Sequence, residues 1–224
     1  MGLGIRGAVI AGASAALLAC GGGGDGQQPA QGLRFNTDAA FVNALGGASL
    51  TDLAAVDPAG GRYTASLTYS ALPDGSFAGA PARRSLQTTT VGRAGEPPAV
   101  TTLTVFYETE PARILATVTD AGTTTVFAQA TRLPAAGTVG QSGPLAQGTV
   151  YAGTALTAPT GTETLSWSIE ADGATTALAC LTSVSGPANW VSTERDCFRI
   201  DGAGNISGGT ISIERPGVAL HFWR

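Results

Sequence analysis

The feature that most constrains the fold is a two-residue alternation of apolar and polar side chains, which recurs from Arg62 to the C-terminus. Tyr, Leu, Ile, Val and Trp alternate with Thr, Ser or Glu in several segments, among them 63–69, 102–107, 165–170 and 210–214. Because successive side chains of a β-strand point to opposite faces, this period predicts strands with one buried face. Turn-forming residues separate the segments, so neighbouring strands are expected to pair antiparallel.

The number of strands limits how the sheet can close. We expect about ten strands after residue 60, whereas residues 48–61 are expected to form a loop or a short irregular segment. An antiparallel sheet of that size has to curl, split or close to protect its edges. The predicted fold class is therefore all-β, an antiparallel meander that closes as a barrel or packs as a two-sheet sandwich.

One short helix is predicted ahead of the strands. Asn36-Thr37-Asp38 supplies N-cap chemistry, and Gly46-Gly47 supplies a C-terminal stop. Between them, Phe41, Val42 and Leu45 fall on one helical face.

The clearest turn signal is Asp172-Gly173. A two-residue turn at this pair places Trp167 opposite Leu178, and Leu165 opposite Cys180. The apolar side chains of both strands, with Cys180 among them, then point toward the core.

Pro216-Gly217 predicts the last hairpin of the chain. With this turn, Ile213 lies opposite Leu220, and Ile211 lies opposite Phe222. A Pro-Gly pair favours a type II turn, whose twist suits a hairpin poorly, so this register rests mainly on the matching apolar faces.

The first twenty residues are typical of an export signal. Arg6 precedes an uncharged and mostly apolar run over residues 7–19. As a helix this run would span about 20 Å, which is short of the hydrocarbon core of about 30 Å. The segment therefore predicts a cleaved signal peptide rather than a membrane span.

Leu17-Leu18-Ala19-Cys20 followed by Gly21 resembles the lipobox of bacterial lipoproteins. The resemblance implies a diacylglycerol on Cys20, cleavage before this residue, and a further acyl chain such as palmitate on the new amine. Two or more acyl chains give a stable membrane anchor. In this family an Asp directly after the lipidated Cys retains the protein in the inner membrane, so Gly21 implies the outer membrane, on its periplasmic face or at the cell surface.

This interpretation divides the chain into three parts. Residues 1–19 are the expected signal peptide, residues 20–35 a flexible Gly-rich tether, and residues 36–224 a single β domain. The stretches TETLSWSIEADG and ERDCFRIDGAGN resemble uncharacterised lipoproteins of high-GC proteobacteria, a resemblance that implies no activity.

The two remaining cysteines predict a disulfide. With Cys20 acylated, Cys180 and Cys197 form an even set in an oxidising envelope. The strand patterns conflict, however, because alternation with Phe198 and Ile200 turns Cys197 outward while the hairpin above turns Cys180 inward. Either a bulge between them or cover on both faces of these strands would reconcile the two patterns.

The charges exclude two classes of protein. The chain has no Lys, 12 Arg and 16 acidic residues, and loss of Arg6 with the signal peptide leaves a net charge of −5. A nucleic-acid partner is excluded because such a protein needs a cationic face. A histidine-cluster metal site is excluded because His221 is the single His, and no cofactor or metal is expected. Membrane contact is expected through the lipid on Cys20 alone.

Few residues point to a specific site. His221 shares a strand face with Ser212, but the chain has no nucleophile elbow, and we assign no catalytic residue. Glu194 and Asp196 lie two residues apart and would point to the same side of a strand, where glycosidase chemistry would require a cleft. Trp190 lies in a loop near the expected disulfide and is the candidate for contact with a ligand or partner.

These features predict a lipid-anchored envelope lipoprotein whose non-catalytic β domain binds or scaffolds an unidentified protein or small-ligand partner. One alternative is a carrier that holds a small apolar or glycan ligand in a closed barrel. The other is an envelope hydrolase. An internal apolar cavity would favour the carrier, whereas a cleft that gathers His221 or two carboxylates with other polar groups would favour the hydrolase.

Overall fold

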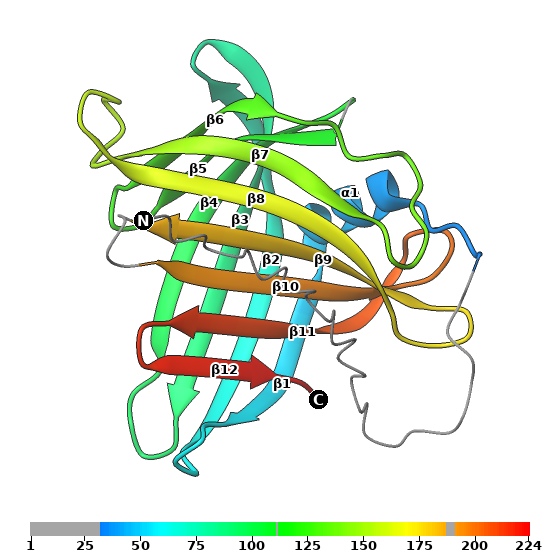
Figure 1. Ribbon diagram of the computed structural model, residues 1–224. Helices are drawn as coiled ribbons and strands as arrows, with labels where there is room; N and C mark the ends of the chain where they lie inside the picture. Colours follow the sequence, from blue (N-terminus) through cyan, green and yellow to red (C-terminus); the bar gives the residue numbers. More distant parts are fainter. Residues whose placement is uncertain (1–31, 111, 187–190) are drawn as a thin grey trace, which may run out of the picture.

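The computed structural model describes residues 32–110, 112–186 and 191–224, which form one twelve-stranded antiparallel sheet in which each strand pairs with the next (Figure 1). The expectation of an all-β meander with one short helix is confirmed. The strands are β1 (Ser49–Val56), β2 (Arg62–Phe77), β3 (Ala80–Arg93), β4 (Ala99–Thr109), β5 (Ala112–Thr119), β6 (Thr124–Ala130), β7 (Ser142–Tyr151), β8 (Pro159–Ala171), β9 (Ala177–Gly186), β10 (Ser192–Ile200), β11 (Ile206–Arg215) and β12 (Val218–Phe222).

The first and last strands meet, so the sheet closes as a barrel rather than as a sandwich. The backbone N–H of Ala54 on β1 donates to the carbonyl of Trp223, just after β12, at 2.9 Å, and the N–H of Trp223 donates back at 3.1 Å. In Figure 1, β8–β12 cross in front of β1–β4 at a steep angle, as in a flattened barrel. Closure leaves an inner face, where most of the buried apolar side chains lie, and an outer face.

Strand β1 corrects the expected loop at 48–61. Leu50, Leu53 and Ala55 are buried, but the register with β2 shifts between Leu50 and Leu53. Asp52 lies in this irregular stretch with a φ of 58°, in the left-handed region. The bulge breaks the two-residue period, and the strand is therefore hidden from a pattern-based reading.

The expected helix is α1 (Thr37–Gly47), and Asn36 caps it by accepting the Ala39 N–H at 2.9 Å. Its buried face is made mainly of Ala40, Ala44 and Leu45. The helix contacts β2, β3, β5 and β11, strands from different sides of the barrel, and so lies across one end of the interior (Figure 1).

The β8–β9 hairpin differs from its predicted register. Trp167 lies opposite Leu181, not Leu178, and the turn is a five-residue loop over 172–176. The side chain of Asp172 accepts a hydrogen bond from Thr176 Oγ1 at 2.7 Å and pairs with Arg199 on β10 at 2.8 Å. These contacts hold Asp172 in a wider loop than the two-residue turn.

The register change resolves the conflict between the cysteines. A shift of three residues is odd, so it moves Cys180 from the inner to the outer face of the sheet. There Cys180 lies directly opposite Cys197, and the predicted disulfide between them is confirmed. The prediction that Cys180 faces inward was wrong.

The last hairpin follows its predicted register. On β11 and β12, Ile213 lies opposite Leu220 and Ile211 lies opposite Phe222, and all four side chains are buried. The matching apolar faces therefore fixed this pairing despite the unfavourable turn type.

Candidate ligand-binding cavity

A cavity of about 320 Å³ lies inside the barrel, beside α1. Most of its lining is apolar and comes from the helix and from strands on several sides of the barrel, including Phe41, Leu45, Val105, Ile114, Leu165 and Phe198. One side of the lining is acidic and consists of Glu163, Ser183, Ser185, Glu194 and Asp196 on β8, β9 and β10, while neutral polar side chains such as Gln87 and Thr125 lie elsewhere in the lining. The cavity thus combines an apolar body with one acidic wall.

Strand alternation explains the acidic wall. Phe198 and Ile200 on β10 belong to the core, so Glu194 and Asp196, at even spacing from them, face the same side. Asp196 lies between Leu181 of β9 and Ile211 of β11, and Glu194 lies opposite Ser183. The polar patch is therefore continuous across three adjacent strands.

In two carboxylates of this wall, one oxygen has no hydrogen-bond partner among the described residues. Asp196 is only 6% exposed, and within the described part of the chain its Oδ1 has no hydrogen-bond partner. The same holds for Oε1 of Glu194. Glu163, by contrast, accepts a hydrogen bond from Ser183 Oγ at 2.8 Å. Buried polar atoms are nearly always paired in native proteins, which makes Asp196 and Glu194 the unusual residues of the cavity.

Burial changes the protonation of this wall. Burial raises the pKa of Asp196 well above its ordinary value, and the neighbouring negative charge of Glu194 raises it further. Burial also raises the pKa of Glu194, with a smaller increase from Glu163, against the opposing attraction of Arg215. The pKa of the Tyr69 phenol is raised well above its ordinary value by burial first, and then by Asp196 and Glu194. Tyr69 therefore lies close enough to these carboxylates for their negative charge to act on its hydroxyl group.

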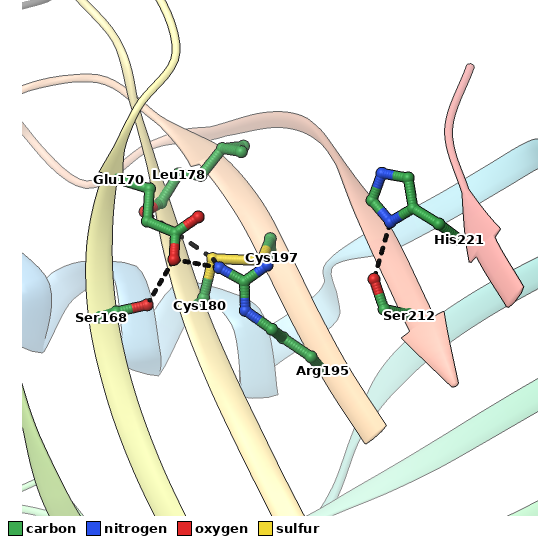
Figure 2. Close-up of polar contacts among 8 residues, drawn as sticks. All are labelled: Ser168, Glu170, Leu178, Cys180, Arg195, Cys197, Ser212 and His221. Carbon is green, nitrogen blue, oxygen red and sulfur yellow. Dashed lines mark hydrogen bonds and ion pairs between the residues drawn. A yellow bond between two sulfur atoms is a disulfide. The ribbon is translucent and has the colours of Figure 1, made fainter. Parts of the chain in front are cut away.

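On the outer face, behind this wall, the disulfide forms the centre of a small polar cluster (Figure 2). Arg195 forms an ion pair with Glu170 and places its Nη2 3.2 Å from the Sγ of Cys180. Ser168 Oγ donates to Glu170 at 3.0 Å. The cluster joins β8, β9 and β10, the same three strands that carry the acidic wall. It also directs the Arg195 guanidinium away from the cavity.

The pair of Ser212 and His221 lies elsewhere. Ser212 Oγ and His221 Nδ1 are 2.7 Å apart, and the His221 ring stacks on Trp223 with centroids 5.6 Å apart. His221 is exposed, and in Figure 2 the pair lies on β11 and β12, set apart from the disulfide cluster. The expected facing of Ser212 and His221 is confirmed, but neither residue lines the cavity.

Two predicted site residues, Cys20 and Trp190, lie outside the described residues. Within residues 32–110, 112–186 and 191–224 no cluster of three or more His, Cys, Asp or Glu side chains could hold a metal ion. In the same ranges, no helix combines the length and the apolar character needed to cross a membrane.

The sequence placed Glu194 and Asp196 on one strand face, but the wall that they form with Glu163 was not predicted as a site. Its signal was present in the sequence, because Asp196 and Phe198 are two residues apart and therefore share a face. Comparison of the chain with protein-family models, curated proteins and solved structures finds no match among them. The cavity and its lining are therefore the basis of the functional argument.

Proposed function

We propose that this protein is a lipid-anchored carrier of the bacterial envelope, which holds a small, largely apolar molecule inside its barrel. The observation that supports the proposal best is the cavity of about 320 Å³ beside α1, lined mostly by apolar side chains. Ligand sites in proteins typically begin at about 300 Å³ and combine an apolar lining with a few polar groups. The cavity has both properties.

The close packing of protein interiors favours a bound molecule in this cavity. Protein interiors are close-packed and contain few voids larger than a water molecule. On α1, the small residues Ala40 and Ala44 line the cavity together with Thr37 and the larger Phe41 and Leu45. Longer apolar side chains at the two alanines would fill part of this space, so the small residues keep room for a ligand.

The anchoring part of the proposal rests on the lipobox-like sequence that ends at Cys20. Fourteen residues lie between Cys20 and Phe35, the point where the barrel begins to hold the chain. A Gly-rich segment of that length has a root-mean-square span of about 20 Å. A barrel tethered in this way would receive or deliver its ligand close to the membrane.

Native mass spectrometry tests the carrier function directly. The chain from residue 21 onward, exported to an oxidising periplasm behind a cleavable signal, should carry a defined additional mass. The cavity-filling variant Ala40→Phe should lose that mass. Val42→Phe enlarges the same helix at a residue outside the cavity lining and should keep it. A wild-type protein that shows only its own mass, and that binds no alkyl probe when one is added, would refute the carrier function and favour a scaffolding role.

A further inference from the structure

The acidic wall indicates the chemistry of the ligand. Asp196 is 6% exposed, and its nearest strand neighbours on the inner face are Leu181 and Ile211. A carboxyl group in such surroundings is costly unless a donor satisfies it. Among the described residues none provides a hydrogen bond to its Oδ1. The missing donor can therefore come from a bound molecule.

The charges around the cavity have one sign. Glu163, Glu194 and Asp196 belong to its lining, and no Arg or His is found among the described residues that line it. The ion pairs of the described chain include none of these three carboxylates. An anionic ligand would gain no ion pair here and would raise the pKa of these carboxyl groups further. Gln87 and several threonines add hydrogen-bonding groups, but apolar residues predominate in the lining, which favours an apolar body over a glycan.

The arginines of the neighbouring strands do not neutralise this wall. Arg195 and Arg199 alternate with the inward residues of β10 and are held in ion pairs with Glu170 and Asp172. Arg215 attracts Glu194 from the end of β11, but its own side chain is exposed. A bound cation would therefore favour the ionised form of Asp196 and release its proton, and no described residue of the lining supplies such a charge.

Aromatic rings lie beside the carboxylates. The rings of Tyr69 and Phe198 have centroids 6.2 Å apart, and both belong to the cavity lining. Phe198 follows Asp196 by two residues on the same strand face. Aromatic faces attract cations through their quadrupole, so they favour the same kind of head group as the carboxylates.

From this geometry we propose that the ligand is a cationic amphiphile, a protonated amine or amidinium on an apolar body, and that Asp196 pairs with its nitrogen. Glu194 and Glu163 extend the acidic surface along β10 and β8 and assist the approach of the cation. The apolar body packs on the helix side of the cavity, against residues such as Phe41 and Leu45. This inference rests on the proposed carrier function and specifies its ligand class.

Three probes of equal chain length test the proposal. Octylammonium, 1-octanol and octanoate present the same apolar body with a cationic, neutral or anionic head, and calorimetry measures the affinity of each for the chain from residue 21 onward. The affinity of octylammonium should exceed that of octanol by about 10-fold or more, because charge-assisted hydrogen bonds are about twice as strong as neutral ones. Octanoate should bind most weakly.

Two isosteric variants assign the preference to its residue. Asp196→Asn should abolish the advantage of octylammonium over octanol while it leaves octanol binding within about 3-fold, and thermal unfolding confirms that the variant folds. Glu170→Gln makes the same chemical change on the outer face and should keep the preference. A preference that persists in folded Asp196→Asn refutes the role of Asp196. Equal affinity for all three probes refutes the cationic ligand but leaves the carrier function standing. No binding of any probe, together with a native mass that shows the chain alone, refutes the carrier function itself.

Discussion

The buried carboxyl of Asp196 predicts an unusual dependence of stability on pH. Its pKa in the folded protein is raised by burial and by Glu194, so the folded state binds this proton more tightly than the unfolded chain does. Stability falls with pH wherever the folded state binds more protons. We therefore expect the contribution of Asp196 to decline as the pH rises from the unfolded pKa of about 3.9 toward the raised folded pKa.

The size of the effect follows from one proton. Within that window each pH unit costs about 1.4 kcal/mol of unfolding free energy. For a domain of this size, 1 kcal/mol corresponds to about 2–4 °C in the melting temperature. Asp196→Asn removes the titrating group while it keeps the shape of the side chain. The melting temperature of the variant should therefore rise relative to that of the wild type by about 3–6 °C for each pH unit within the window.

The assay is thermal unfolding of the ligand-free wild type and Asp196→Asn at pH 4, 5, 6 and 7. Asp172 is the matched control, because its hydrogen bonds from Arg199 lower its pKa in the folded protein. The stability that Asp172 provides is present above its unfolded pKa and is lost only as the pH falls through the folded value, so Asp172→Asn should lose a constant amount from pH 5 to 7. If the gap between the wild type and Asp196→Asn is also constant over that range, the pKa of Asp196 is not raised and the reasoning is refuted.

Three further predictions concern the scaffold. Replacing both Cys180 and Cys197 by Ala should lower the unfolding free energy by about 2–4 kcal/mol in urea, because the bridge closes a loop with a sequence separation of 17; equal stability with and without the bridge would contradict this. Asn36→Ala should cost about 1 kcal/mol in the same assay, and no loss would show that the cap is unimportant. Gly209→Ala should prevent stable folding, because its Cβ would lie 2.0 Å from the carbonyl oxygen of Cys197. Gly46→Ala is the control and should fold, because its Cβ would meet nothing within 4 Å. A stable Gly209→Ala barrel would show that the strands can separate.

Local patterns were sufficient for much of the fold. The two-residue period predicted antiparallel strands, and the apolar faces of Ile211 and Ile213 fixed the final hairpin. Asn36 and Gly47 delimit α1 as their residue types suggest. These features depend on residues that are close in the sequence, and each strand carries its own signal.

Most of the features that were missed depend on distant contacts. The β8–β9 register follows from a loop in which Asp172 pairs with Arg199, 27 residues away, and no local turn rule includes that contact. Strand β1 was missed for a local reason, because the bulge around Asp52 breaks its two-residue period. The cavity depends on how side chains from α1 and many strands fill one interior, so the residue types of its acidic wall could be read from the sequence but its volume could not.

The connection at Phe35 has a mechanical consequence for a protein held by its N-terminus. Phe35 exchanges two backbone hydrogen bonds with Gly137, at 2.8 and 2.9 Å, and the N–H of Asn36 donates to Gly202 at 3.1 Å. The Phe35 side chain is completely buried. A force applied to the chain before this point is therefore transferred to the β6–β7 and β10–β11 loops before it reaches α1. If the N-terminus is anchored as proposed, these contacts would carry tension to the two loops before it reached the helix beside the cavity.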